Sequence, residues 1–258
     1  MQNSLFDLSG RKVIVTGASQ GIGRAIAEAL HAFGAKICII GAHDTVFEAA
    51  KNIAAVGGPT VKAVKGDLGD RATREALFAE CMQKLDGEID VLVNNAGINI
   101  RKTDALHYAY EDWDRMFAVN VEAVFYFCQF AAREMLKRGY GKIINTASIA
   151  GMRGVKCAAV YSATKAAVIH MSEALSNEWA SKGIRVNCIC PGFTETGLAQ
   201  VSLQNQERMH AVLGSLPIGR IAQPADIAGA AVFLASSASD FITGVHLPVD
   251  GGASSCGT

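Results

Sequence analysis

The sequence predicts an α/β fold in which one doubly wound, seven-stranded parallel sheet carries helices on both faces. Short runs rich in valine and isoleucine are almost continuously apolar, as strands buried on both faces of a sheet should be. These runs alternate with amphipathic stretches, and such alternation is typical of parallel strands joined by right-handed crossovers. A length of 258 residues, half of them apolar, suits a single domain over residues 1–258.

The elements can be placed in order along the chain. The predicted strands are 12–17, 35–41, 61–67, 89–97, 141–148, 184–192 and 244–252. The predicted helices between them include 21–33, 70–85, 111–138 and 160–182. The stretch 193–222 interrupts this alternation directly after the sixth strand. A segment of that length at the end of a strand predicts a lid over a substrate site.

Composition argues against several classes of partner. The 24 basic and 24 acidic residues balance, whereas nucleic acids and anionic membranes normally require a basic face. No run of 18 uncharged apolar residues occurs, and the opening MQNSLFDLSGRK lacks the pattern of a secretory signal. The seven cysteines are scattered without a CxxC pair, and no other cluster has the spacing of metal ligands, so no metal is expected. This cysteine usage fits a reducing cytoplasm.

A glycine-rich turn joins the first strand to the first helix in KVIVTGASQGIGRAIAEAL. Gly17 permits a tight turn, Gly21 lets the backbone approach a pyrophosphate, and Gly23 lets the helix pack closely against the strand. The start of the helix then presents N–H groups and the positive end of its dipole to the phosphates. We therefore expect a bound dinucleotide. The spacing differs from that of a P-loop, and no Gly-Lys-Ser/Thr follows, which argues against phosphoryl transfer.

Six motifs stand in order over nearly the whole chain. They are TGASQGIG at 16–23, NNAG at 94–97, Asn120 in FAVNVEAVF, Ser148 in INTASIAG, Tyr161 and Lys165 in YSATK, and PG at 191–192. Together they resemble the classical short-chain dehydrogenase/reductase family, which has a Rossmann fold and a nicotinamide cofactor. The resemblance implies an NAD(P)-dependent oxidoreductase that interconverts a secondary alcohol and a ketone. A dinucleotide-binding sensor or scaffold without turnover is the alternative from another class, and the presence of Tyr161 and Lys165 disfavours it.

The resemblance also implies four catalytic residues. Tyr161 would be the general acid/base and Ser148 would hold the substrate oxygen. Lys165 would bind the ribose hydroxyls and lower the pKa of the tyrosine, and Asn120 would hold a water in the proton relay. These residue types suit the chemistry, because a free tyrosine with a pKa near ~10 is a poor base at neutral pH. An ammonium group one helical turn away favours the tyrosinate.

The same resemblance implies the cofactor contacts. Asp67 is expected to meet the adenine amino group, residues 95–97 to flank the adenosine ribose, and residues 191–196 to cover the nicotinamide carboxamide. The full set of expected cofactor-binding residues is Gly17, Ser19, Gln20, Gly21, Ile22, Gly23, Asp67, Leu68, Asn95, Ala96, Gly97, Tyr161, Lys165, Pro191, Gly192, Thr194 and Thr196.

The end of the second strand, CIIGAHD, bears on the choice between NAD(H) and NADP(H). Family members that prefer NAD usually have an aspartate near position 41, where this chain has Gly41. Members that prefer NADP have a basic residue near position 42 or before Gly21, where this chain has Ala42, Ser19 and Gln20. His43 is the nearest candidate cation, and a histidine carries little charge at pH 7. The sequence therefore favours NAD(H) slightly over NADP(H), with a phosphate held by His43 and backbone amides as the alternative.

The substrate is a small molecule whose class the sequence narrows only in part. Arg101, Arg153 and Lys156 place positive charge near the mouth of the site, which suits a carboxylate or a phosphopantetheine group, although ordinary solvated loop charges are the favoured explanation of each. NNAGINIRKTDAL followed by Trp113 resembles members that act on sugar acids and polyols, such as gluconate 5-dehydrogenases. We expect that class, with a 3-oxoacyl-(acyl-carrier-protein) reductase as the alternative. The lid also contains apolar Leu198, Val201, Leu203 and Met209.

Apolar helix surface predicts self-association. The stretches MFAVNVEAVFYFCQFAA and AVIHMSEAL carry more apolar residues than packing on one side of a sheet requires. The family commonly forms tetramers through such helices and through the last strand. We therefore expect a homotetramer.

Overall fold

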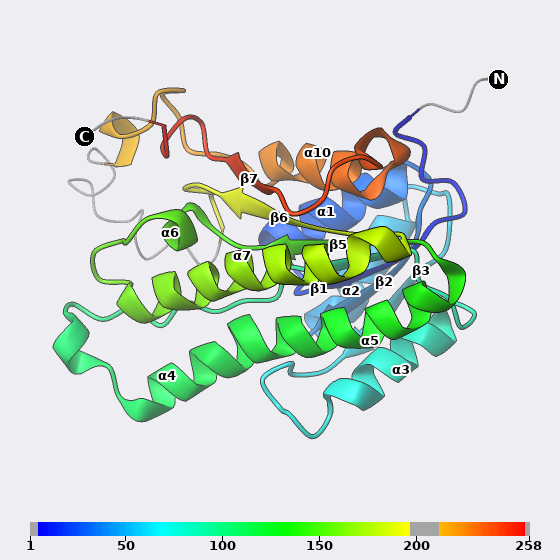
Figure 1. The fold of residues 1–258 in the computed structure, drawn as a ribbon, viewed down its shortest axis with the longest axis horizontal. Helices are drawn as coiled ribbons and strands as arrows, with labels where there is room; N and C mark the ends of the chain where they lie inside the picture. Colours follow the sequence, from blue (N-terminus) through cyan, green and yellow to red (C-terminus); the bar gives the residue numbers. More distant parts are fainter. Residues whose placement is uncertain (1–4, 197–211, 256–258) are drawn as a thin grey trace.

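The computed structural model describes residues 5–196 and 212–255, and these form one sheet of seven parallel strands (Figure 1). The strand order is β3-β2-β1-β4-β5-β6-β7, which confirms the predicted fold class. Most predicted strands are a few residues too long at their carboxyl ends, where the chain leaves the sheet in loops. The strands are β1 (Lys12–Thr16), β2 (Lys36–Gly41), β3 (Val61–Lys65), β4 (Val91–Asn94), β5 (Gly141–Thr146), β6 (Ile184–Pro191) and β7 (His246–Val249).

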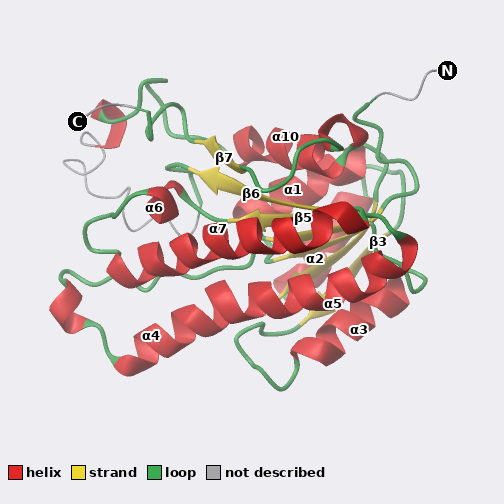
Figure 2. Ribbon diagram, in the orientation of Figure 1, coloured by secondary structure: helices red, strands yellow, loops and turns green. Residues whose placement is uncertain are grey.

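Helices cover both faces of the sheet (Figure 2). One face packs against α1 (Gly21–Ala32), α2 (Thr45–Ala54) and α10 (Pro224–Ala235). The other packs against α3 (Arg74–Lys84), α5 (Ala123–Arg138) and α7 (Ala159–Trp179). The alternation of side chains along a strand produces the two cores, because Val13 and Val15 enter the first and Ile14 enters the second. Two shorter helices precede members of the second layer in the sequence: α4 (Tyr110–Phe117) comes before α5, and α6 (Ile149–Met152) comes before α7.

The strand order creates a crevice at the carboxyl ends of the central strands. From β1 the chain builds outward through β2 and β3, and it then returns to place β4 on the other side of β1. Loops leaving β1 and β4 therefore part in opposite directions, which is the point where doubly wound sheets bind ligands.

The predicted continuous helix over 111–138 is wrong at its centre. A π-helical turn, η2 (Ala118–Glu122), separates α4 from α5, and the Ala123 N–H donates to the Ala118 carbonyl. The Ala118 carbonyl also accepts a hydrogen bond from the buried side chain of Arg74. Contacts from other parts of the chain therefore support a turn that helical periodicity alone does not predict.

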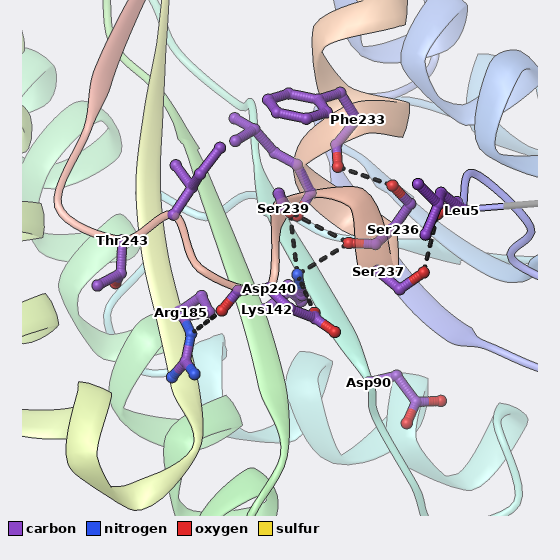
Figure 3. Close-up of polar contacts among 12 residues, drawn as sticks. Leu5, Asp90, Lys142, Arg185, Phe233, Ser236, Ser237, Ser239, Asp240 and Thr243 are labelled. Carbon is purple, nitrogen blue, oxygen red and sulfur yellow. Dashed lines mark hydrogen bonds and ion pairs between the residues drawn. The ribbon is translucent and has the colours of Figure 1, made fainter.

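A buried lysine organises the opposite end of the sheet (Figure 3). Lys142 Nζ donates to the Ser236 carbonyl at 2.8 Å and to Ser239 Oγ at 2.9 Å, and it lies 2.7 Å from Asp240 Oδ1. Burial lowers the pKa of Lys142, and the pairing with Asp240 opposes this effect. The network joins the start of β5 to the segment that follows α10.

Candidate active site

A cavity of about 1210 Å³ lies at the carboxyl ends of the strands. Every expected cofactor-binding residue lines it, together with Ser148, Tyr161 and Lys165. Asn120 is the exception among the predicted catalytic residues, because it is fully buried beside the cavity and does not line it. The topology thus brings together residues that lie between positions 17 and 196 of the sequence.

The glycine turn has the shape expected of a phosphate cradle. Gly17 and Gly21 have φ angles of +65° and +58°, which favour glycine. A Cβ on Gly17 would lie 2.6 Å from the Ala96 Cα, and one on Gly23 would lie 2.3 Å from Asn95 Nδ2. The N-cap residue of α1, Gln20, makes no side-chain capping bond, so the helix start presents its N–H groups beside the cavity. These features fit a dinucleotide pyrophosphate.

Asn95 braces this turn through its side chain. Its Nδ2 donates to the carbonyls of Thr16 at 3.2 Å and Gly17 at 3.1 Å. In return, Thr16 Oγ1 accepts from the N–H groups of Asn95 and Ala96, both at 3.0 Å. The amide of Asn95 is therefore engaged within the protein, although the residue lines the cavity as expected. Thr16 opens the motif TGASQGIG, but sequence reasoning assigned no role to its side chain.

Asp67 also has a protein partner. Its carboxylate accepts from Arg115 Nη2 at 2.8 and 3.0 Å and from the Gly69 N–H at 2.8 Å. Partial burial works to raise the pKa of Asp67, but these hydrogen bonds outweigh it and hold the pKa below its ordinary value. Arg115 lines the same cavity, and sequence reasoning missed it because its partner Asp67 lies 48 positions earlier in the chain.

Ser148, Tyr161 and Lys165 come from two adjoining helices. Ser148 is the N-cap of α6, where its Oγ accepts from the Ala150 N–H at 3.1 Å. Tyr161 and Lys165 lie one turn apart in α7, and Lys165 Nζ is 5.7 Å from the centre of the Tyr161 ring. The ammonium donates to the Thr146 carbonyl at 2.7 Å. The predicted one-face arrangement of phenol and ammonium is present.

Burial shapes the titration of both groups. Burial raises the pKa of Tyr161, while a hydrogen bond with Ser148 and the positive charge of Arg101 oppose the rise. Burial lowers the pKa of Lys165 to about 8. Arg101 therefore acts on the phenol electrostatically, a contribution that sequence reasoning did not assign to it.

Asn120 sits at the centre of η2. Its Oδ1 accepts from the Ile98 N–H at 2.8 Å, and its Nδ2 donates to the Ile98 carbonyl at 2.8 Å and to Thr164 Oγ1 at 3.1 Å. A Cβ on Gly97 would lie 3.4 Å from both Asn120 Oδ1 and Lys165 Nζ, so both polar groups flank one glycine. Asn120 thereby ties the π turn to the loop after β4, close to Lys165.

The predicted lid, 193–222, is described at its two ends, and residues 197–211 with their apolar side chains lie outside the described residues. The Ala222 N–H donates to the Phe193 carbonyl and the Glu195 N–H to the Ala222 carbonyl, which joins the two ends. Phe193 and Val212 contribute to a small apolar cluster over Ile149. Arg101, Arg153 and Lys156 also line the cavity.

The described residues contain neither a group of metal ligands nor a membrane-spanning helix. Within 5–196 and 212–255, no three His, Cys, Asp or Glu side chains are grouped as metal ligands. None of the described helices combines the length and apolar character needed to cross a bilayer.

Known proteins are similar to this chain over almost its full length. A family model described as enoyl-(acyl carrier protein) reductase matches residues 17–254. Nodulation protein G of Rhizobium sp. (strain N33) is 38% identical over 96% of this chain and 98% of its own. The 2-dehydro-3-deoxy-D-gluconate 5-dehydrogenase of Dickeya dadantii is 37% identical over 96% of both chains.

A solved structure has the same fold. The crystal structure of a gluconate 5-dehydrogenase from Burkholderia cenocepacia J2315, in complex with NADP and tartrate, is 34% identical. It superposes with a TM-score of 0.94 and covers 100% of both chains. With the motifs, the cavity and these relatives in agreement, the chain belongs to the short-chain dehydrogenase/reductase family of oxidoreductases.

Proposed function

We propose that the protein interconverts a secondary hydroxyl and a ketone on a sugar acid, using a nicotinamide dinucleotide. The observation that carries the proposal is that three cationic side chains, those of Arg101, Arg153 and Lys156, line the same cavity as Ser148 and Tyr161. A carboxylate at one end of the substrate would pair with this positive charge while a hydroxyl further along reaches the phenol. The names of the Dickeya and Burkholderia relatives support this substrate class.

The protein residues divide the proton chemistry among them. When bound, the dinucleotide supplies hydride exchange with the carbinol carbon. We assign Ser148 to hold the substrate oxygen and Tyr161 to exchange its proton. Lys165 is assigned to the ribose hydroxyls and to the electrostatics of the phenol, and Asn120 to a segment that holds a relay water beside Lys165. Because burial raises the pKa of Tyr161, proton release needs the positive charges that surround it.

The part of the cavity lining at the carboxyl end of β2 bears on the choice between NAD(H) and NADP(H). A Cβ on Gly41 would lie 2.1 Å from Ser19 Oγ and 3.0 Å from Val46 Cβ, so an aspartate there would force its neighbours to move. No carboxylate therefore repels a 2′-phosphate at this position. His43 is the only basic residue between positions 40 and 45. The slight preference for NAD(H) remains our prediction, and this neutral lining supports use of both cofactors.

Binding measurements test this choice directly. Titration of the protein with NADH and NADPH, followed by the fluorescence of the reduced nicotinamide, should give dissociation constants within about tenfold of each other, which is about 1.4 kcal/mol. A His43→Arg variant should move the ratio toward NADPH by supplying a permanent cation. A ratio above a hundredfold in either direction for the native protein would contradict shared use.

We also propose a homotetramer that works in a reducing cytoplasm. Trp113, Phe125 and Tyr126 leave 46%, 36% and 42% of their surface exposed on consecutive helical segments, which supports a helix-mediated interface. The six cysteines among the described residues are all free, which supports a reducing location. Light scattering after size exclusion would give the mass, and a monomer at micromolar concentration would contradict the assembly.

A substrate panel tests the reaction. Nicotinamide absorbance is followed with gluconate-type acids, neutral polyols of the same chain length, and 3-oxoacyl thioesters. Sugar acids should exceed the matched polyols at least about tenfold in kcat/KM, and Arg153→Met should remove most of that advantage. Preference for the thioesters would favour the acyl-carrier-protein reductase instead. Dinucleotide binding without turnover of any compound would favour a non-catalytic sensor.

A further inference from the structure

Arg74, the first residue of α3, is buried although it carries a permanent charge. Only 2% of its surface is exposed, between the loop after β3 and the helical rod of α4, η2 and α5. A guanidinium removed from water is costly unless its N–H groups are paired. Its partners therefore indicate what the residue holds in place.

Three acceptors surround the guanidinium. Nε donates to the Leu68 carbonyl at 2.7 Å, Nη2 donates to the Ala118 carbonyl at 2.8 Å, and Nη1 lies 3.2 Å from Glu122 Oε2. Glu122 also forms an ion pair with the exposed Arg71, whose Nε donates a hydrogen bond to Glu122 Oε2 at 2.7 Å. One planar side chain thus links two backbone carbonyls and one carboxylate from separate segments.

These acceptors sit at the two ends of the π turn and in the loop at the predicted adenine end of the cavity. Ala118 and Glu122 are the first and last residues of η2, whose middle residue is Asn120. Leu68 lines the cavity next to Asp67, where the dinucleotide is expected. A second link, from Arg115 in α4 to Asp67, joins the same two segments.

A π turn is a rare interruption of an α-helix, so contacts from outside the helix are expected to hold it in place. The Ala118 carbonyl accepts the Ala123 N–H that closes the turn, and Arg74 donates to the same oxygen. The guanidinium also holds the carboxylate of Glu122 at the other end. Loss of both contacts would let the turn relax toward α-helical geometry and would displace Asn120 from Ile98.

We propose that Arg74 is a positioning residue that sets the register of the π turn and couples the adenine loop to the Asn120 segment. The proposal rests on the proposed function, because it takes Asn120 as part of the proton relay. Arg74 touches neither the substrate nor the reacting atoms. It acts through Leu68 on the cofactor side and through Ala118 and Glu122 on the relay side.

The test compares Arg74→Met with Arg71→Met in the full-length protein. Both substitutions remove an arginine from Glu122, but only the first also removes the donors to the two carbonyls. Arg74→Met should lower kcat about tenfold or more, because a small displacement of a proton-relay group lowers the reaction rate strongly. It should also raise the dissociation constant for the reduced dinucleotide several-fold and enlarge the solvent deuterium isotope effect on kcat. Arg71→Met should stay within about twofold of the native protein in all three.

Two further variants keep the test decisive. Arg74→Lys retains the charge with fewer hydrogen-bond donors. It should therefore change kcat, the dissociation constant and the isotope effect in the same directions but by smaller factors, even if Arg74→Met folds poorly. Asn120→Ala should reproduce the enlarged isotope effect. A lower melting temperature with native kcat and isotope effect in both Arg74 variants would overturn the positioning role alone. Native kcat in Asn120→Ala would overturn both the relay assignment and this inference.

Discussion

The buried ammonium of Lys165 should make the stability of the cofactor-free protein depend on pH in a defined direction. Burial lowers the pKa of this group from 10.5 to about 8 in the folded chain, whereas the unfolded chain keeps the ordinary value. Between these two pKa values the unfolded state binds more protons than the folded state. The free energy of unfolding therefore rises with pH across this window, and below pH 8 the folded protein bears the full cost of the buried charge.

The size of this effect follows from the shift. A fall from 10.5 to about 8 corresponds to about 3.4 kcal/mol when fully expressed. Between pH 7 and pH 9.5 about 2 kcal/mol of this should be recovered. Burial holds the pKa of Cys188 at about 12 and that of Cys190 at about 11, so these neighbours stay protonated over the measured range.

The assay is urea unfolding of the native protein and Lys165→Met at several pH values without dinucleotide. The variant cannot titrate at this position, so its stability relative to the native protein should fall by about 2 kcal/mol as pH rises from 7 to 9.5. Lys51→Met, at an exposed position on α2, serves as the control and should show a constant difference. A pH-independent difference between native protein and Lys165→Met would refute the reasoning, since the ammonium would then be no costlier folded than unfolded.

Four other substitutions probe three separate features. Tyr161→Phe should lower kcat about 10²–10⁴-fold while the dissociation constant for the reduced dinucleotide changes less than about twofold, and near-native turnover would disprove the acid/base assignment. Gly17→Ala should lower the free energy of unfolding by about 1–3 kcal/mol in urea, because its φ is +65° and a Cβ meets Ala96. Gly229→Ala, where a Cβ in α10 meets nothing within 4 Å, should be neutral or stabilising, and equal losses in both glycine variants would contradict this contrast. Lys142→Met should cost about 1–3 kcal/mol by stranding the acceptors on Ser236 and Ser239, and an unchanged urea midpoint would show that water replaces the ammonium.

The sequence was informative wherever a local pattern has one physical meaning. Valine and isoleucine runs predicted all seven strands, and the spacing of Tyr161 and Lys165 predicted their shared helix face. It failed where a residue takes its role from distant partners. The π turn depends on Arg74, which lies 44 positions before Ala118, and the side-chain amide of Asn95 depends on the Thr16 carbonyl. Neither pairing leaves a periodic trace in the chain.

The lysine network at the amino end of β5 has a consequence for biosynthesis. Lys142 lies in the first strand of the chain's second half, yet its partners Ser236, Ser239 and Asp240 are 94 or more positions later. A nascent chain that ends before residue 236 must leave this ammonium hydrated, which keeps the start of β5 open to water. The amino end of β5 therefore gains its native packing only after residues 236–240 have been synthesised and have docked against it.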